Sequence, residues 1–120
     1  MTITLKTLHQ ATAQEVFDQV KNHLLTQMKK SQKGFETVCL YRNSGGLKCA
    51  AGCLIADDEY KLSPFEKIGD WNALVAEGCV PTAHSKLIYS LQALHDFSTP
   101  GDWAARLQEV AYEYGLNYGD

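Results

Sequence analysis

The sequence predicts an α+β fold, mainly α, with four to five helices packed on a small antiparallel β-hairpin. Apolar residues recur at helical spacing through most of the chain, which indicates amphipathic helices. Residues 35–51 break this period, because β-prone residues flank an Asn-Ser-Gly-Gly turn. A hairpin is only marginally stable alone, so we expect it to pack on the helices.

The chain has 120 residues, of which 45% are hydrophobic, and a net charge of −3. That length suits one hydrophobic core, and no linker-like segment divides it, so we expect a single globular domain over residues 1–120. The basic residues are scattered, which disfavours non-specific nucleic-acid binding. The sequence shows neither a signal peptide nor an apolar run long enough for a membrane span, so we expect no membrane association and a cytoplasmic location.

The first helix is predicted over residues 13–32. Thr12 and Glu15 form a capping box at its start, and Gly34 provides a stop. The hairpin follows, with a first strand over Phe35–Tyr41, a turn at Asn43–Gly46 and a second strand over Leu47–Ala51.

Further helices are predicted from their starts. The acidic run at Asp57 begins a short helical turn, and Ser63 to Glu66 reads as a second capping box with Pro64 at the first helical position. Asp70 caps a helix over Trp71–Glu77. The two last helices are predicted to begin at Pro81 and Thr99, to end near Phe97 and Gly115, and to be antiparallel because their joint is short.

The four cysteines are predicted to be reduced, buried, free residues. A zinc site would need their four sulfurs to converge, but the chain contains no Cys-x-x-Cys pair. We therefore predict no metal and no cofactor. The cysteines are Cys39, Cys49, Cys53 and Cys79.

The candidate site is placed around the hairpin turn, where a cationic side chain and close-approaching backbone amides would bind a carboxylate or phosphate. His95 and Asp96, near the end of a predicted helix, are added because they could reach the same groove. A plain hairpin with solvated charges remains an open alternative. The candidate ligand-binding residues are Tyr41, Arg42, Lys48, Cys49, His95 and Asp96.

The run from Tyr41 to Ile55 resembles a family of small bacterial and bacteriophage-encoded proteins that share a Tyr-Arg…Gly-Leu-Lys-Cys-Ala-x-Gly-x-Leu-Ile core. The first helix, residues 91–96 and Trp103 are also similar. Ala56 stands where that family often has Pro. The family is uncharacterised, so the resemblance implies a bacterial or phage-infected host cell and no activity.

We therefore predict a non-catalytic binding module, a phage- or prophage-encoded modulator of a host process. It would act through a protein partner or a small anionic ligand, and a homodimer is compatible with its aromatic content. The alternative is a small hydrolase that uses Cys49 or Cys53 with His95, or a metal held by His and Asp. The sequence leaves enzymatic activity open and favours its absence.

Overall fold

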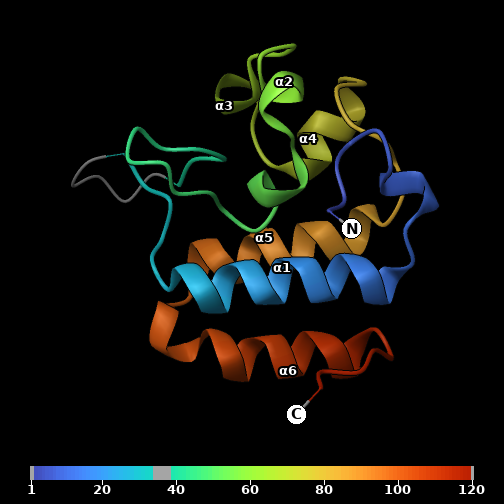
Figure 1. Ribbon diagram of the computed structural model, residues 1–120, viewed down its shortest axis with the longest axis vertical. Helices are drawn as coiled ribbons and strands as arrows, with labels where there is room; N and C mark the ends of the chain where they lie inside the picture. Colours follow the sequence, from blue (N-terminus) through green and yellow to red (C-terminus); the bar gives the residue numbers. More distant parts are fainter. Residues whose placement is uncertain (1, 34–38, 120) are drawn as a thin grey trace.

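The computed structural model describes residues 2–33 and 39–119, and this part of the chain is mainly helical (Figure 1). Single turns of 3-10 helix lie at Leu8–Gln10 (η1), Gly52–Leu54 (η2) and Pro100–Asp102 (η3). The α-helices are α1 (Ala13–Gln27), α2 (Asp57–Tyr60), α3 (Phe65–Ile68), α4 (Trp71–Ala76), α5 (Ser85–Phe97) and α6 (Trp103–Glu113).

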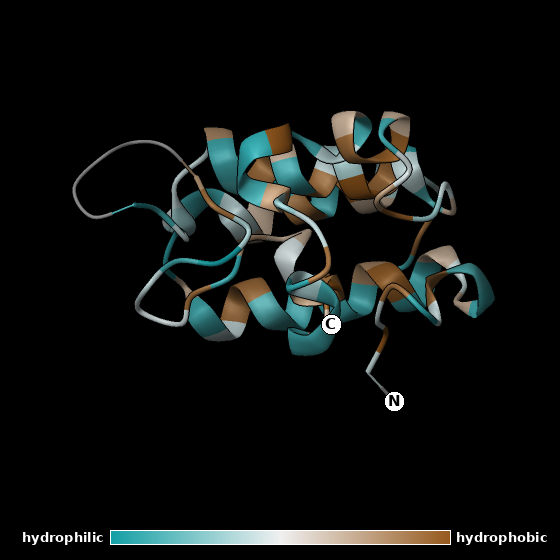
Figure 2. Ribbon diagram, turned by 90° about the horizontal axis from the view of Figure 1, so that it is seen from above, coloured by the Kyte–Doolittle hydropathy of each residue, from teal (hydrophilic) through white to brown (hydrophobic). Residues whose placement is uncertain are grey.

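The three long helices form the centre of the molecule. Helix α5 packs against α1, α4 and α6, and α6 also contacts α1. Helices α5 and α6 are antiparallel, as predicted, and α6 lies on the opposite side of the α1–α5 layer from α2, α3 and α4 (Figure 1). Hydrophobic and hydrophilic residues are mixed along each long helix (Figure 2), as expected when one side of a helix is buried.

The buried apolar side chains form a contiguous core. Its largest fully buried members include Phe17 from α1, Phe65 from α3, Trp71 from α4 and Trp103 from α6. Among the described residues, no helix combines the length and the apolar character that a membrane span requires.

The start of α1 was predicted correctly and its end was not. The Thr12 side chain accepts a hydrogen bond from the Glu15 amide, and the Glu15 carboxylate accepts one from the Thr12 amide. The helix ends at Gln27 instead of residue 32, because Met28 adopts a left-handed conformation with φ of 51°. Gly34, the predicted stop, lies outside the described residues.

The predicted β-hairpin is wrong, and with it the α+β fold class. The described residues contain no strand, and the two isolated antiparallel bridges pair Gln32 with Cys39 and Arg42 with Lys48. Residues 35–38 of the predicted first strand lie outside the described part. The chain does reverse direction at Asn43, whose side-chain oxygen accepts hydrogen bonds from the amides of Gly45 and Leu47.

Side chains from distant elements occupy the backbone groups that a hairpin ladder would use. The amides of Tyr41 and Arg42 donate to the Glu66 carboxylate on α3. The Lys48 amide donates to the Gln27 side chain on α1. A backbone N–H can donate to a side-chain oxygen as well as to the carbonyl of a neighbouring strand. Segment 39–51 therefore packs as a loop between α1 and α3.

Two other helix starts differ from their predictions. Helix α3 begins at Phe65 with Pro64 as its N-cap, one residue later than predicted, and proline has no side-chain acceptor for a cap. The Glu66 carboxylate, predicted to close a capping box with Ser63, binds the amides of Tyr41 and Arg42 instead. Helix α5 begins at Ser85, since His84 has a left-handed φ of 57° and its imidazole donates to the Ala11 carbonyl at 2.6 Å. Asp70 caps α4 as predicted, accepting a hydrogen bond from the Ala73 amide.

Candidate functional site

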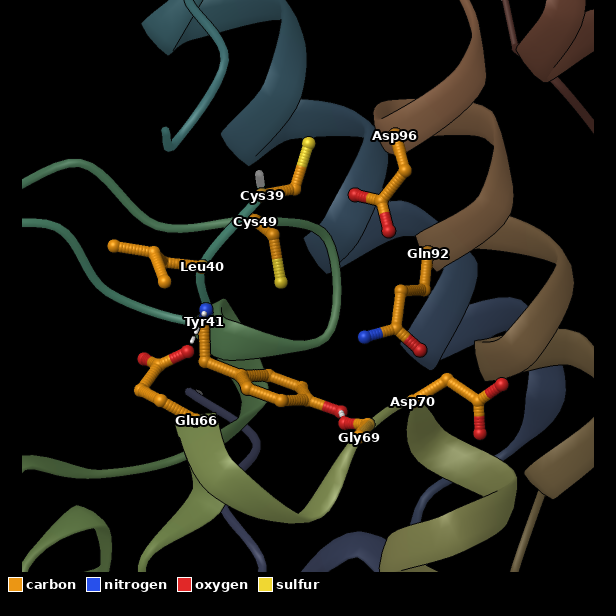
Figure 3. Close-up of a pocket in the computed structure, with 9 residues that line it drawn as sticks. All are labelled: Cys39, Leu40, Tyr41, Cys49, Glu66, Gly69, Asp70, Gln92 and Asp96. Atoms are coloured by element: carbon orange, nitrogen blue, oxygen red, sulfur yellow. Dashed lines mark hydrogen bonds between the residues drawn. The ribbon is translucent and has the colours of Figure 1, made fainter. Parts of the chain in front are cut away.

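A cavity of about 240 Å³ lies between α5, residues 39–41 and the joint of α3 and α4 at residues 69–70 (Figure 3). Helix α5 contributes Gln92 and Asp96, whose side chains are four residues apart and share one helix side. The residues that line the cavity are Cys39, Leu40, Tyr41, Cys49, Glu66, Gly69, Asp70, Gln92 and Asp96.

The lining of this cavity mixes polar and apolar surface, and its charged groups are all acidic. Three of its residues are carboxylic acids, namely Glu66, Asp70 and Asp96, and none of its described residues is Lys or Arg. The remaining polar groups are two thiols, one phenol and the Gln92 amide. The cavity therefore offers hydrogen-bond acceptors and negative charge.

His95 lies behind the cavity wall and fixes the Asp96 carboxylate. The Ser31 amide donates to His95 Nε2 at 3.0 Å, so Nε2 is unprotonated and Nδ1 of the neutral ring carries the proton. Nδ1 then donates to Asp96 Oδ1 at 2.7 Å. The ring is fully buried and stacks on Trp103, with 5.4 Å between ring centroids. Asp96 is thus held in place by an imidazole that cannot easily turn.

The cysteine thiols near the site are poor nucleophiles. Burial, followed by the neighbouring Asp96 carboxylate, raises the pKa of Cys39 from 9.0 to about 11. Burial also raises the pKa of the Cys49 thiol, and that of Cys53 to about 12. A cysteine hydrolase needs a thiolate, which a nearby cation would favour. These thiols are protonated near neutral pH and act as hydrogen-bond donors or packing groups.

Cys39, His95 and Asp96 have the spacing of a metal site, since one ligand atom from each lies within 4.8 Å of the others. The hydrogen bonds of His95 do not suit a metal ion. Coordination through Nδ1 would leave a neutral ring protonated at Nε2, facing the Ser31 N–H that now donates to that atom. A metal-bound histidine normally donates its second N–H to an acceptor. This is the one such group among the described residues, so the four cysteines do not converge.

Glu66 lines the cavity but is already committed to the fold. Its Oε1 accepts from the Tyr41 amide at 2.9 Å, and its Oε2 accepts from the Arg42 amide at 3.0 Å and the Tyr60 hydroxyl at 2.6 Å. Asp70 uses one oxygen to cap α4. The carboxylates with remaining capacity are therefore those of Asp70 and Asp96.

Tyr41 and Gln92 close the cavity from two sides. The Tyr41 hydroxyl donates to the Gly69 carbonyl at 2.7 Å, and burial raises its pKa, so it stays protonated. The Gln92 side chain is buried and accepts from the Trp71 amide at 2.8 Å, while its nitrogen points into the cavity near the Tyr41 ring (Figure 3). These bonds tie both side chains to residues 69–71, at the joint of α3 and α4.

Two of the predicted ligand-binding residues lie away from the cavity. Arg42 Nη1 binds Asp57 Oδ1 at 2.6 Å and Nη2 binds the Ile55 carbonyl at 2.6 Å, while its guanidinium lies 4.8 Å from the Tyr60 ring centroid. The Arg42 hydrogen bond and charge hold the pKa of the Asp57 carboxyl below its usual range. The Arg42 guanidinium therefore ties the loop to residues 55–57 and lies outside the cavity.

Lys48 joins the loop to α1 through its backbone. The side chains of His23 and Gln27 both donate to the Lys48 carbonyl at 2.9 Å. Burial lowers the pKa of His23, which favours the neutral ring in this contact. Lys48 is not among the residues that line the cavity.

Of the six predicted residues, Tyr41, Cys49 and Asp96 line the cavity and His95 supports Asp96 from behind. The prediction missed Cys39, Glu66, Asp70 and Gln92 as site residues. Gln92 carried a readable signal, since it is a polar residue beside the apolar stripe of α5 and one turn before Asp96. The sequence signal at Glu66 was misleading, because its spacing from Ser63 indicated a capping box.

The fold and the cavity define a small helical protein with a cavity on one side of α5, whose charged lining residues are all acidic. Comparison of the chain with known protein families, with curated proteins and with solved structures finds no match.

Proposed function

We propose that the protein is a non-catalytic binding protein that holds a small organic cation in the cavity beside α5. The observation that carries this proposal is the Asp96 carboxylate, which His95 fixes at the wall of a cavity without a basic side chain. The side chain of Asp96 is 25% exposed, so part of it can meet a ligand. A cation beside a half-buried carboxylate gains a charge-assisted hydrogen bond.

This proposal changes the sign of the ligand charge from the one predicted. The anionic ligand was inferred from Arg42 and Lys48, and the cation of Arg42 is paired with Asp57. The lining of the cavity offers an anion three carboxylic acids and no basic side chain. The Lys30 ammonium lies nearby and donates to the Asp96 carbonyl at 3.1 Å, but Lys30 is not among the lining residues. An anionic ligand remains a prediction that would need a site elsewhere.

The contacts also support binding over hydrolysis. The alternative pairs Cys49 or Cys53 with His95, yet both nitrogens of His95 already have partners, Ser31 and Asp96. A general base needs a free lone pair aimed at the proton it removes. The raised pKa values of the Cys49 and Cys53 thiols also argue against hydrolysis, because they disfavour the nucleophilic thiolate.

The proposed setting is a bacterial or phage-infected host cell, where the protein would modulate a host process. This part of the proposal rests on the family resemblance of the run from Tyr41 to Ile55. A protein partner and a homodimer stay predictions.

Titration with n-butylammonium, followed by amide chemical shifts, tests the proposal. We expect saturable shifts in α5 and in residues 39–41, and about tenfold weaker binding for Asp96→Asn, which removes the charge and keeps an acceptor for His95. Asp58→Asn is the matched control, because Asp58 is exposed and does not line the cavity. Equal binding by Asp96→Asn, or tighter binding of butyrate than of butylammonium, would contradict the proposal.

A further inference from the structure

A second hollow adjoins the cavity on the outer side of α5. Its volume is about 110 Å³, and Asp70, Gln92 and Asp96 line both spaces. The second hollow adds Tyr89, Ala93 and Phe97 from α5. The same two carboxylates can therefore be reached from a polar inner space and from a more apolar outer one.

The two aromatic residues of the outer hollow are exposed. Phe97 is 86% exposed and Tyr89 is 38% exposed, although both belong to a helix whose other side is buried. Phe97 thus leaves most of an apolar ring in contact with water. An aromatic ring beside carboxylates suits an organic cation, because its face attracts positive charge and its apolar surface packs against carbon groups.

We infer that the ligand of the acidic cavity is an organic cation with an attached apolar, aromatic group, whose ammonium lies at Asp70 and Asp96 and whose apolar group packs on Phe97 and Tyr89. This inference rests on the proposed function and adds the ligand class to it. The inner space holds the charged end and the outer hollow selects the rest of the molecule. The buried Gln92 side chain lies at the boundary of the two spaces.

A series of ligands that differ in one feature tests the inference by isothermal titration calorimetry. The series consists of n-butylammonium, 4-phenylbutylammonium, 4-phenylbutanol and 4-phenylbutyrate. We expect 4-phenylbutylammonium to bind about tenfold more tightly than n-butylammonium, since it adds an aromatic contact. The neutral alcohol and the carboxylate are expected to bind more weakly than either ammonium.

Two exposed aromatic positions provide the matched variants. Phe97→Ala should remove most of the tenfold gain, measured as the ratio of the affinities for 4-phenylbutylammonium and n-butylammonium within the same variant. Tyr112→Ala removes a ring that is 90% exposed on α6 and lines neither space, so it should change nothing.

The outcomes separate this inference from the proposed function. If n-butylammonium binds and the phenyl group adds no affinity, or if the gain survives in Phe97→Ala, the inference is wrong and the proposed function stands. If neither ammonium binds, or if 4-phenylbutanol binds as tightly as 4-phenylbutylammonium, both are wrong.

Discussion

Asp96 receives hydrogen bonds from two neighbours that differ in chemistry. His95 Nδ1 donates to Oδ1, and the Cys39 thiol is a second hydrogen-bond partner of the carboxylate. The Ser31 amide completes the chain by donating to the far side of the imidazole. Each donor stabilises the anionic form of a carboxylate, and the negative charge in turn opposes ionisation of the thiol.

The reactivity of Cys39 should depend on Asp96. We expect Asp96→Asn to lower the pKa of Cys39 from about 11, because the carboxylate is its second-largest cause. Burial, the largest cause, stays in place, so the pKa should remain above 9.0. At about pH 8.5 the thiolate fraction then rises, and alkylation by iodoacetamide should be several-fold faster. Peptide mapping by mass spectrometry measures this rate.

The other cysteines in the same digest are the controls. Cys79, which lines a different cavity, should be alkylated at the same rate in both proteins. An unchanged rate at Cys39 would show that the Asp96 charge does not act on this thiol.

At the scale of elements, α2 and α3 are held by carboxylates that bind distant backbone. Each helix has four residues, too few to be stable alone. On α2, the buried Glu59 accepts hydrogen bonds from the amides of Leu5, Lys6 and Ala56. Glu66 on α3 binds the 39–51 loop in the same way. Tertiary contacts therefore hold these helices in place.

The turn η2 depends on close approach at Gly52. A Cβ atom at this position would lie 2.1 Å from the Tyr41 carbonyl oxygen and 3.0 Å from the Tyr41 carbonyl carbon, and these backbone atoms cannot turn aside as a flexible side chain could. The contact brings η2 against the segment that carries Tyr41 into the cavity. A larger residue would have to separate these two segments.

We expect Gly52→Ala to lower the free energy of unfolding by about 3 kcal/mol, because the methyl group would overpack the loop. Urea denaturation followed by circular dichroism measures this change. Gly101→Ala is the matched control, since a Cβ there meets nothing within 4 Å. A loss of less than about 0.5 kcal/mol for Gly52→Ala would mean that the loop has room to relax.

At the scale of the molecule, stability is concentrated in the three long helices. Helices α1, α5 and α6 pack on one another and contribute a large share of the core. The loop and short helices on one side of this layer form the cavity (Figure 1). The cavity is thus lined by one long helix, α5, and by the loop and short helices that pack beside it.

Amide hydrogen exchange should follow this division. We expect the central amides of α1, α5 and α6 to exchange only by global unfolding, and those of α2 and α3 to exchange faster by local opening. Exchange measured by NMR in native buffer and in low urea distinguishes the two routes. Equal protection in α2 and α5 would show that the whole chain opens as one unit.

Elements with local signals were predicted well. The capping groups Thr12 and Asp70 are close in sequence to the amides they bind, and α1 and α4 start where these signals place them. The last α-helix starts at Trp103, after the 3-10 turn Pro100–Asp102, and not at Thr99 as predicted. The apolar period of α5 likewise marks its buried side, with Leu87, Ile88, Leu91 and Leu94 in the core. Near neighbours in sequence set these features, so the sequence alone determined them.

Only the tertiary structure decided that segment 39–51 forms a loop instead of the predicted hairpin, and which residues line the cavity. The Glu66 carboxylate lies about 25 residues beyond the Tyr41 amide that it binds, and no local pattern links the two. The same holds for Ser31 and His95, which are 64 residues apart. A backbone N–H gains a similar free energy by donating to a strand carbonyl or to a side-chain oxygen, and the packing of distant helices determines which acceptor it meets.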